Sequence, residues 1–282
     1  MIQDLTQGNP QKTLIRYTLP MFISVVFQQL YNMADSMIAG KFAGEDALAA
    51  VGASYPITMI FMAVAVGSNI GCAVVISQLF GAKQFGKLRT AVSTTLLSGL
   101  ILSIVLTVAG LFLTPAMMRA IQTPENIFDQ GALYLRIYIA GFVFLFLYNV
   151  TTGMFNSLGD SKTPLYFLIG SSIGNIILDF VFVKIFEWGV AGVAWATFLA
   201  QGVACVFSLL VFRKRIGEIQ TPERAPWFSW ELLGNIGKIA IPSILQQSFV
   251  SIGNIFIQSR VNSYGSGVIA GYSAAIKLNT FV

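Results

Sequence analysis

The sequence contains no histidine, and only 10% of its 282 residues are charged, whereas soluble domains carry roughly 25%. Without histidine the chain cannot form a His-based catalytic triad, an imidazole proton relay or the common zinc sites. Its two cysteines, Cys72 and Cys205, cannot supply a four-thiolate zinc site, and both lie in apolar runs. We interpret them as small core residues. The composition excludes a disordered chain, a disulfide scaffold and an ordinary soluble enzyme.

Long apolar runs dominate what is present, and mean hydropathy is +0.74. A transmembrane helix needs about 20 mostly apolar residues. Eight uncharged stretches approach or exceed this length, at residues 17–34, 47–82, 90–118, 137–159, 163–178, 188–212, 239–259 and 261–276. The first becomes long enough only by including Asp35, and the fifth only by continuing through Asp179 to about Phe186. The sequence therefore predicts an all-α polytopic membrane protein with two acids inside its spans.

The basic residues are unevenly divided between the two ends of the predicted spans. The amino terminus and every second connection carry eleven: Lys12, Arg16, Lys83, Lys87, Arg89, Lys162, Arg213, Lys214, Arg215, Arg224 and Lys238. The opposite side carries four: Lys41, Arg119, Lys184 and Arg260. By the positive-inside rule, we expect a multi-pass protein of the plasma (inner) membrane with a cytoplasmic amino terminus. The net charge of +5 then reflects topology in a lipid bilayer, and no nucleic-acid partner is expected.

An internal repeat connects the two ends of the chain. Leu19 and Pro20 resemble Ile241 and Pro242, and Asn32 matches Asn254 at the same offset. Six spans separate the copies, so both enter the membrane from the same side and form a parallel repeat. We predict an amino-terminal six-helix lobe at 1–212, a cytoplasmic linker at 213–230, and the start of a carboxy-terminal lobe at 231–282, comprising helix seven and part of helix eight. The second copy is cut short, so we expect the missing carboxy-terminal lobe as a partner and no transport by this fragment alone.

Two carboxylates lie inside predicted spans, where ionisable groups are costly and usually functional. Counting from the outer helix ends at about 1.5 Å per residue puts Asp35 and Asp179 at similar depths, about 8 and 12 Å. Asn175 lies one turn before Asp179 on the same face, and Thr197 reaches the same depth in the sixth span. Carboxylate, amide and hydroxyl oxygens suit an alkali cation, and a carboxylate removed from water also binds a proton more readily. The four residues predict a cation or proton site, in which Asp35 and Asp179 would hold the ion if it is Na⁺. A structural hydrogen-bond cluster is the alternative.

The first span carries further polar residues. Gln28 and Tyr31 continue the stripe of Asp35 at helical spacing, which places both beside a substrate cavity. Asn32 and Ser36 flank the same carboxylate as neighbours of the cation site. Pro20, roughly four helical turns before the acid, predicts a bend in this helix.

Three residues of the fourth span are open to more than one interpretation. Tyr134 and Tyr138, four residues apart near the outer end, reach toward Asp179 or act as interfacial anchors. Asn149 either lines the substrate cavity or pairs between helices. Residues 81–87 and 159–164 combine glycine and lysine in turns, but neither has the P-loop pattern, so nothing indicates a nucleotide cofactor.

The sequence resembles the multidrug and toxic compound extrusion (MATE) transporters at several motifs in order. These are Pro20 with Gln28, Tyr31 and Asp35; residues 81–87; residues 159–164; Asn175 with Asp179; and residues 189–197. The resemblance implies two six-helix lobes in a V, a drug cavity, and export driven by Na⁺ or H⁺. Asp35, Asn175, Asp179 and Thr197 match the family's amino-lobe cation site. Residues 239–259 contain no carboxylate, unlike some members, which argues against a second cation site there.

We therefore expect a cation-coupled multidrug antiporter that exports amphipathic, often cationic, compounds and uses no cofactor besides its coupling ion, Na⁺ or H⁺. A lipid-linked oligosaccharide flippase of the same superfamily is the alternative, and the acid pair favours the exporter. An integral-membrane enzyme is the least supported interpretation, because the chain lacks histidine and any nucleophile with an adjacent base.

Overall fold

The structure is a computed structural model that describes residues 9–38, 41, 45–121, 123, 125–219 and 225–262. Apart from single residues and turns, these segments are helical, and none of them forms a strand. The elements are α1 (Pro10–Ile38), α2 (Glu45–Gly81), α3 (Phe85–Ala120), α4 (Glu125–Ala140), α5 (Phe142–Ser157), α6 (Lys162–Asp179), the π-helix η2 (Phe180–Ile185), α7 (Gly189–Glu218) and α8 (Trp230–Asn262). The predicted all-α class is confirmed.

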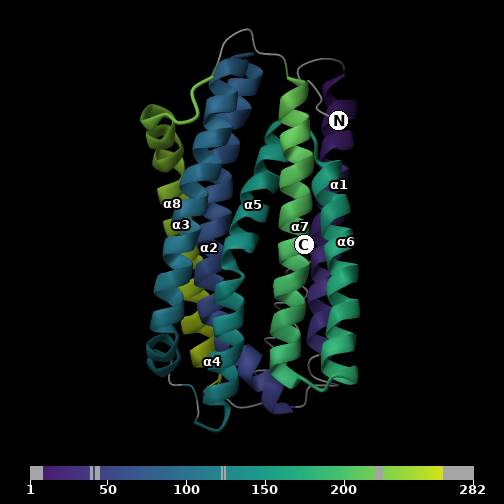
Figure 1. Ribbon diagram of the computed structural model, residues 1–282, viewed down its shortest axis with the longest axis vertical. Coiled ribbons are helices and arrows are strands. Elements are labelled where there is room, and N and C mark those ends of the chain that lie inside the picture. The colour runs from purple at the N-terminus through teal and green to yellow at the C-terminus, as the bar shows by residue number, and fades with distance from the viewer. Residues whose placement is uncertain are drawn as a thin grey trace.

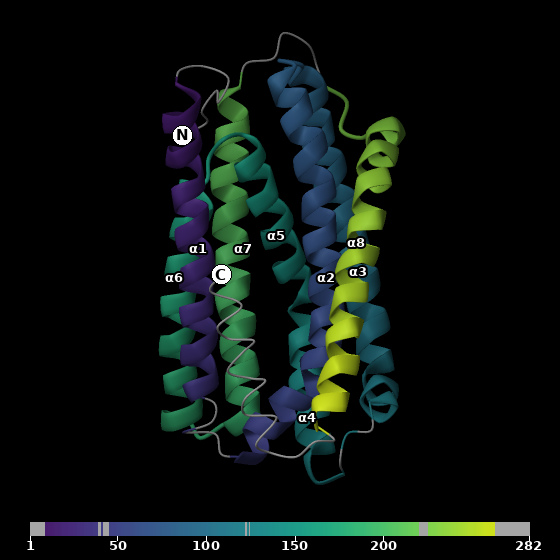
Figure 2. The ribbon, with the colours of Figure 1, turned by 180° about the vertical axis from the view of Figure 1, so that it is seen from behind.

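The helices form an elongated bundle in which successive long segments run in opposite directions (Figure 1). Helices α1, α6 and α7 lie side by side, while α8 lies against α2 and α3, and α5 runs between the two groups (Figure 2). The beginning of α1 lies at the same end of the bundle as the α2–α3 turn, the α5–α6 loop and the start of α8. The basic residues of those segments therefore gather at one end, as the sequence predicts.

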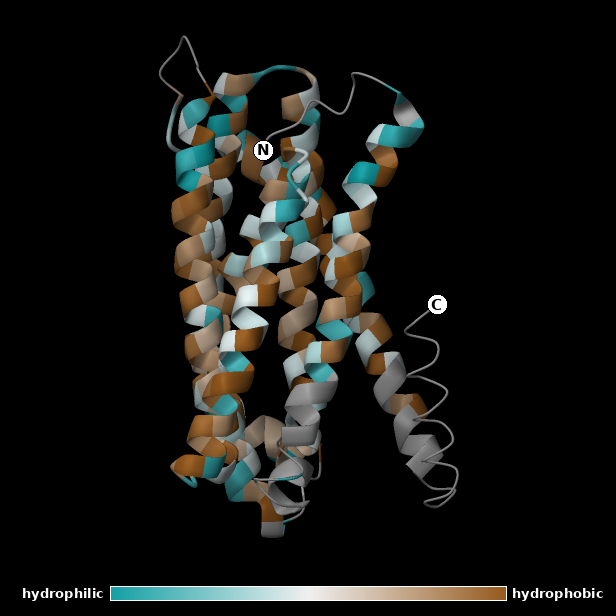
Figure 3. Cartoon of the chain, turned by 90° about the vertical axis from the view of Figure 1, so that its right-hand side faces the viewer, coloured by the Kyte–Doolittle hydropathy of each residue, from teal (hydrophilic) through white to brown (hydrophobic). Residues whose placement is uncertain are grey.

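Four of the described helices, α2, α3, α6 with η2, and α7, are long and apolar enough to cross a membrane, and the α4–α5 pair adds a fifth span if it counts as one. Hydrophobic residues cover most of the length of the helices, while hydrophilic residues are densest at the end that holds the amino terminus (Figure 3). Helices α1 and α8 are long enough by residue count but fall outside that apolar group. Polar residues such as Gln28, Tyr31 and Asn32 lower the hydropathy of α1.

The fourth predicted span is not the one continuous helix expected over residues 137–159. It consists of α4 and α5, which meet at Gly141 with a bend of 47°. A side chain at Gly141 would place its Cβ 3.0 Å from the ring of Phe198 on α7. Glycine lowers helix stability and permits this close approach, and the apolar content of the segment alone does not reveal the break.

The fifth span continues past Asp179, as its length requires, but it changes geometry there. Helix α6 ends at Asp179, and η2 carries the chain to Ile185 with wider turns. The amide of Phe186 donates to the carbonyl of Val181 at 3.0 Å, a five-residue step. Short π-helical segments are rare in proteins, and those that occur often lie at functional sites.

Helix α1 continues through Pro20 as one element. Pro20 itself is buried, and its carbonyl accepts a hydrogen bond from Ser24 Oγ at 2.9 Å. The ring prevents the i→i−4 bond to Arg16, so this position is the weak point of the helix. The repeat partner Pro242 lies inside α8 in the same way.

Residues 159–164 form a cap that begins α6. The Asp160 carboxylate accepts hydrogen bonds from the amide and the hydroxyl of Thr163, at 3.2 and 2.8 Å. Burial acts to raise the pKa of this carboxyl, but the hydrogen bonds that it accepts outweigh burial, and its pKa is lower than usual. The turn predicted at residues 159–164 therefore caps the start of α6.

Two glycines on α2 allow α8 to approach closely. A Cβ at Gly67 would lie 2.5 Å from the backbone nitrogen of Ile244, and one at Gly71 would lie 2.8 Å from the Cα of Ala240. This spacing of small residues brings helix backbones together in membranes, where dispersion replaces the hydrophobic effect as the attraction. Helix α8 thus packs tightly on α2.

Helix α3 binds both ends of the connection between α7 and α8. Arg89 Nη2 donates to three carbonyls at the end of α7, those of Ile216, Gly217 and Ile219, at 3.2, 3.3 and 2.7 Å. The buried Thr94 hydroxyl accepts the amide hydrogen of Ser229 at 3.0 Å, immediately before α8. Carbonyls at a helix end lack intrahelical partners, and the guanidinium supplies donors for those of α7.

Candidate functional site

The inner face of α6 becomes polar over its second half. Its buried residues there are Ser172, Asn175 and Asp179, with 3%, 1% and 0% of their surface exposed. Their spacing of three and four residues places them on one helical face. An apolar face would be expected if this helix served only to pack the bundle, so the polar stripe requires a function or a network of partners.

Asn175 is the residue of this stripe whose burial is hardest to explain by packing alone. Both polar atoms of its amide are buried, and neither makes a hydrogen bond with any residue that the structure describes. A buried amide without partners costs about 1–3 kcal/mol per group. A bound ion or water that accepts and donates at this position would offset that cost.

A hydrogen bond sets the relative height of α1 and α6. Ser161 Oγ, immediately before α6, donates to the carbonyl of Tyr17 on α1 at 2.8 Å, and the Tyr17 hydroxyl donates to the carbonyl of Asn156 at 2.9 Å. Both helices then run in the same direction (Figures 1 and 2). Asp35 follows Tyr17 by the same number of residues as Asp179 follows Ser161, roughly five helical turns in each case. Each position is thus about 27 Å from this bond, in the same layer of the bundle.

Three elements meet one turn outside this layer. Val183 of η2, Val193 of α7 and Tyr134 of α4 form one apolar contact cluster. Asp179 precedes Val183 by four residues, and Thr197 follows Val193 by four, so both lie about 6 Å further into the bundle. The structure therefore brings the segments that carry Asp179 and Thr197 together at one depth.

Three uncharged residues at or beside the predicted site make contacts that the structure describes. The Thr197 hydroxyl donates to the carbonyl of Val193 at 3.1 Å, which leaves its lone pairs to act as acceptors. Tyr134 and Tyr138 stack with ring centroids 6.4 Å apart, and both are partly buried. Both rings pack against apolar clusters of the bundle, Tyr138 in the larger one and Tyr134 in a smaller one.

Of the remaining predicted residues, some have side chains that the structure describes and others do not. Gln28 Nε2 donates to Asn32 Oδ1 at 3.2 Å along an exposed part of α1, and Asn149 Nδ2 donates to the carbonyl of Leu145 at 2.8 Å within its own helix. Tyr31 is partly buried on α1. The side chains of Asp35 and Ser36 lie outside the described residues, so only their positions along α1 are established.

Sequence reasoning missed Ser172 and the change to π-helix after Asp179. The spacing of 172, 175 and 179 in the printed sequence could have revealed Ser172, because three polar residues share one face of an otherwise apolar span. Within the described part of the chain, no three His, Cys, Asp or Glu side chains come together as a metal site.

Comparisons with known proteins agree in pointing to one family. The MatE family model matches residues 20–181. The probable multidrug resistance protein YpnP of Bacillus subtilis is 33% identical over 99% of this chain and 62% of its own length. The multidrug export protein MepA of Staphylococcus saprophyticus is 23% identical over 96% of this chain and 60% of its own length. The chain thus spans about three fifths of the curated relatives that it matches.

A solved structure shares the fold. A MOP superfamily transporter from Pyrococcus furiosus, described as having a binding pocket of reverse polarity that suggests a different function, superposes with a TM-score of 0.87. It is 29% identical, and the match covers 98% of this chain and 62% of that one. The arrangement of α1 to α8 is therefore that of a known multi-pass transporter.

Proposed function

Because this chain belongs to the MatE family of transporters, we propose that it forms the amino-terminal part of a multidrug antiporter driven by Na⁺ or H⁺. The family consists of transporters and not enzymes, and its members are multi-pass proteins of the lipid bilayer. The cargo is an amphipathic, often cationic, compound. The observation that carries the proposal is the buried polar face of α6, with Asn175 and Asp179 in the layer of Asp35.

The energetics of a buried carboxylate supply the coupling. Asp179 is fully buried, and a charge transferred out of water needs a compensating cation, proton or hydrogen-bond network. A cation or proton that enters from outside neutralises the acid, and its loss to the cytoplasm restores the charge. A site that alternates between these two states can drive a second, cationic ligand in the opposite direction, because both compete for the same negative charge.

The donor set fits either ion. Asp35 and Asp179 supply carboxylates, Asn175 an amide oxygen and Thr197 a hydroxyl, and these are hard ligands for Na⁺. Tight Na⁺ coordination requires about five or six oxygens, so backbone groups or water would complete the shell. A proton needs only the carboxylates. The neutral ligands therefore distinguish the two coupling ions.

The full-length protein, reconstituted in vesicles, tests the choice of coupling ion through efflux of a fluorescent cation under one imposed gradient at a time. We expect a Na⁺ gradient alone to support efflux, and Thr197→Val to weaken it by roughly tenfold, since one ligand is lost without a change in volume. Thr114→Val on α3 is the matched control, because the Thr114 hydroxyl also donates to a carbonyl four residues earlier.

Efflux that responds only to a proton gradient, with Thr197→Val unaffected, would remove Asn175 and Thr197 from the coupling role and leave the acids. Absence of efflux under both gradients would contradict ion-coupled antiport. Movement of a lipid-linked oligosaccharide in the same vesicles would indicate the flippase instead.

We further propose a location in the plasma (inner) membrane with the amino terminus in the cytoplasm. The excess of lysine and arginine at the end of the bundle that holds the start of α1 supports this orientation. A cysteine at the exposed Ala82, in the α2–α3 turn, should react with an impermeant thiol reagent only from the cytoplasm. One at Glu125, where α4 begins, should react only from outside. Background is low because Cys72 and Cys205 are buried, and the reverse labelling pattern contradicts the topology.

A further inference from the structure

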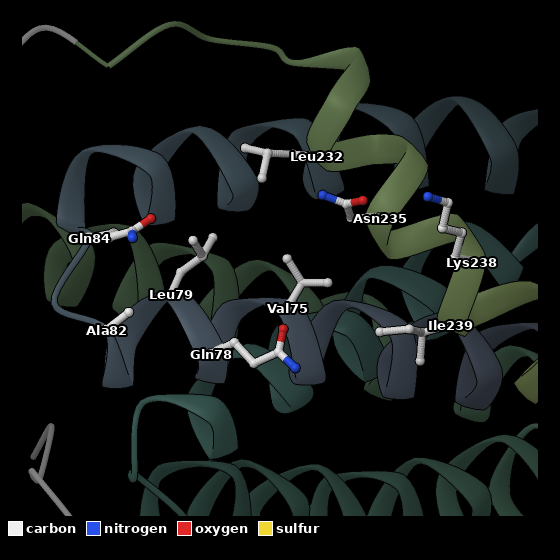
Figure 4. A pocket seen from close by; sticks show the side chains of 9 residues that line it. All are labelled: Val75, Gln78, Leu79, Ala82, Gln84, Leu232, Asn235, Lys238 and Ile239. Atoms are coloured by element: carbon white, nitrogen blue, oxygen red, sulfur yellow. The ribbon is translucent and has the colours of Figure 1, made fainter.

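A cavity of about 430 Å³ lies between the α2–α3 turn and the first turns of α8 (Figure 4). Four polar side chains line it: Gln78 at the end of α2, Gln84 in the turn, and Asn235 and Lys238 on α8. The amides of Gln84 and Asn235 project into the space from opposite sides (Figure 4). The other walls are mainly aliphatic and include Leu79 and Ile239. The cavity is remote from the Asp179 layer and takes no part in the proposed transport cycle.

The chemistry of the lining favours an anion with an apolar attachment. Lys238 contributes a positive charge, the three amides contribute N–H donors, and none of the described side chains that line the cavity is acidic. Ammonium and amide donors together suit a phosphate group. The aliphatic walls suit a hydrocarbon chain, which an inorganic anion lacks.

The position of the cavity indicates where such a ligand would come from. Trp227 and Trp230, immediately before and at the start of α8, are 86% and 78% exposed. Exposed tryptophans at the end of a membrane helix locate the headgroup level of the bilayer. The exposed Lys83 and Lys87 flank the same turn and add positive potential to this end of the bundle. Anionic lipids concentrate beside such groups at the cytoplasmic surface.

We propose that this cavity binds the headgroup of an anionic phospholipid, with the phosphate at Lys238 and the amides, and with acyl carbons along the aliphatic walls. A lipid bound here contacts both α2 and α8, the helices through which the predicted first and second repeats pack on each other. The proposal is independent of the coupling ion and the cargo, because binding is measured without transport.

Native mass spectrometry of the full-length protein, purified in detergent, tests the proposal. The protein is titrated with phosphatidylglycerol, with phosphatidylethanolamine, and with phosphatidylglycerol in the presence of inorganic phosphate. We expect phosphatidylglycerol to be retained preferentially, and inorganic phosphate not to displace it. Lys238→Gln should weaken retention by roughly fivefold, the effect of one lysine near an anionic lipid surface. Lys12→Gln, which removes an exposed lysine at the same end of the bundle, is the matched control and should retain the lipid.

A second variant shows whether any loss of lipid in Lys238→Gln comes from binding or from a folding defect. Asn235 is exposed on α8, so Asn235→Asp should fold while placing a negative charge beside the phosphate, and it should also lower retention. Equal retention of the two lipids would overturn the proposal, as would unchanged retention in both cavity variants. Displacement of phosphatidylglycerol by inorganic phosphate would show a site for free anions and would overturn the lipid assignment.

Discussion

Asp179→Asn is expected to reduce gradient-driven efflux to the background of empty vesicles while the protein still inserts into the membrane. The substitution keeps the shape of a fully buried side chain but removes the charge that a cation or proton neutralises. Asp35→Asn, in the same layer of α1, should have the same effect. Initial rates of efflux of a fluorescent cation, normalised to the amount of inserted protein, are the measurement.

Asp129 provides the matched control for charge. It is an exposed acid on α4, and Asp129→Asn removes one negative charge without altering a buried layer. We expect its efflux to remain within about twofold of the unchanged protein, because exposed charges contribute little. Undiminished efflux in both Asp179→Asn and Asp35→Asn would show that the polar face of α6 only holds the bundle together.

Gly67→Leu should weaken the association of α2 with α8. Even a Cβ at this position would lie 2.5 Å from backbone nitrogen and 2.6 Å from Cα of Ile244, so the backbone of α8 must move away. Overpacking of this kind costs about 1–3 kcal/mol. We expect the apparent melting temperature in detergent to fall by about 5 °C.

Gly52→Leu tests whether the loss comes from contact or only from the removal of glycine. Gly52 lies on the same helix, and nothing approaches within 4 Å of a Cβ built there. We expect this variant to melt at or slightly above the unchanged temperature, because leucine has a higher helix propensity than glycine. Equal destabilisation by both substitutions would contradict the assigned packing of α2 on α8.

Hydropathy and residue spacing predict most of the bundle. The apolar runs give α2, α3, α6 and α7, and the need for about 20 residues per span correctly extends the fifth through Asp179. The break at Gly141 could not be predicted in this way, since residues on both sides of it are apolar and the close approach of Phe198 from α7 is a contact between distant parts of the chain. Periodicity also cannot distinguish the π-helix of η2 from a continuing α-helix, because its 6 residues make fewer than two turns.

Part of the candidate site could likewise be predicted from the sequence, and part could not. Distances from the helix ends place Asp35 and Asp179 at comparable depths, but only the hydrogen bond from Ser161 to Tyr17 fixes the two helices at the same height. Asn175 was predicted from its spacing to Asp179. Its burial without a described partner depends on how α6 packs against its neighbours, which no single helix encodes.

The attachment of both ends of the α7–α8 connection to α3 changes what that connection can transmit. Arg89 and Thr94 hold Ile219 and Ser229 to one helix, so a pull along the chain from α7 is absorbed at α3 before it reaches α8. Residues inserted between these two anchors add only a small closure entropy, about 0.6 kcal/mol for each doubling of the loop. Movement of α8 is therefore governed by its packing on α2 and α3, and the number of residues between Ile219 and Ser229 can change without altering the contacts of either helix.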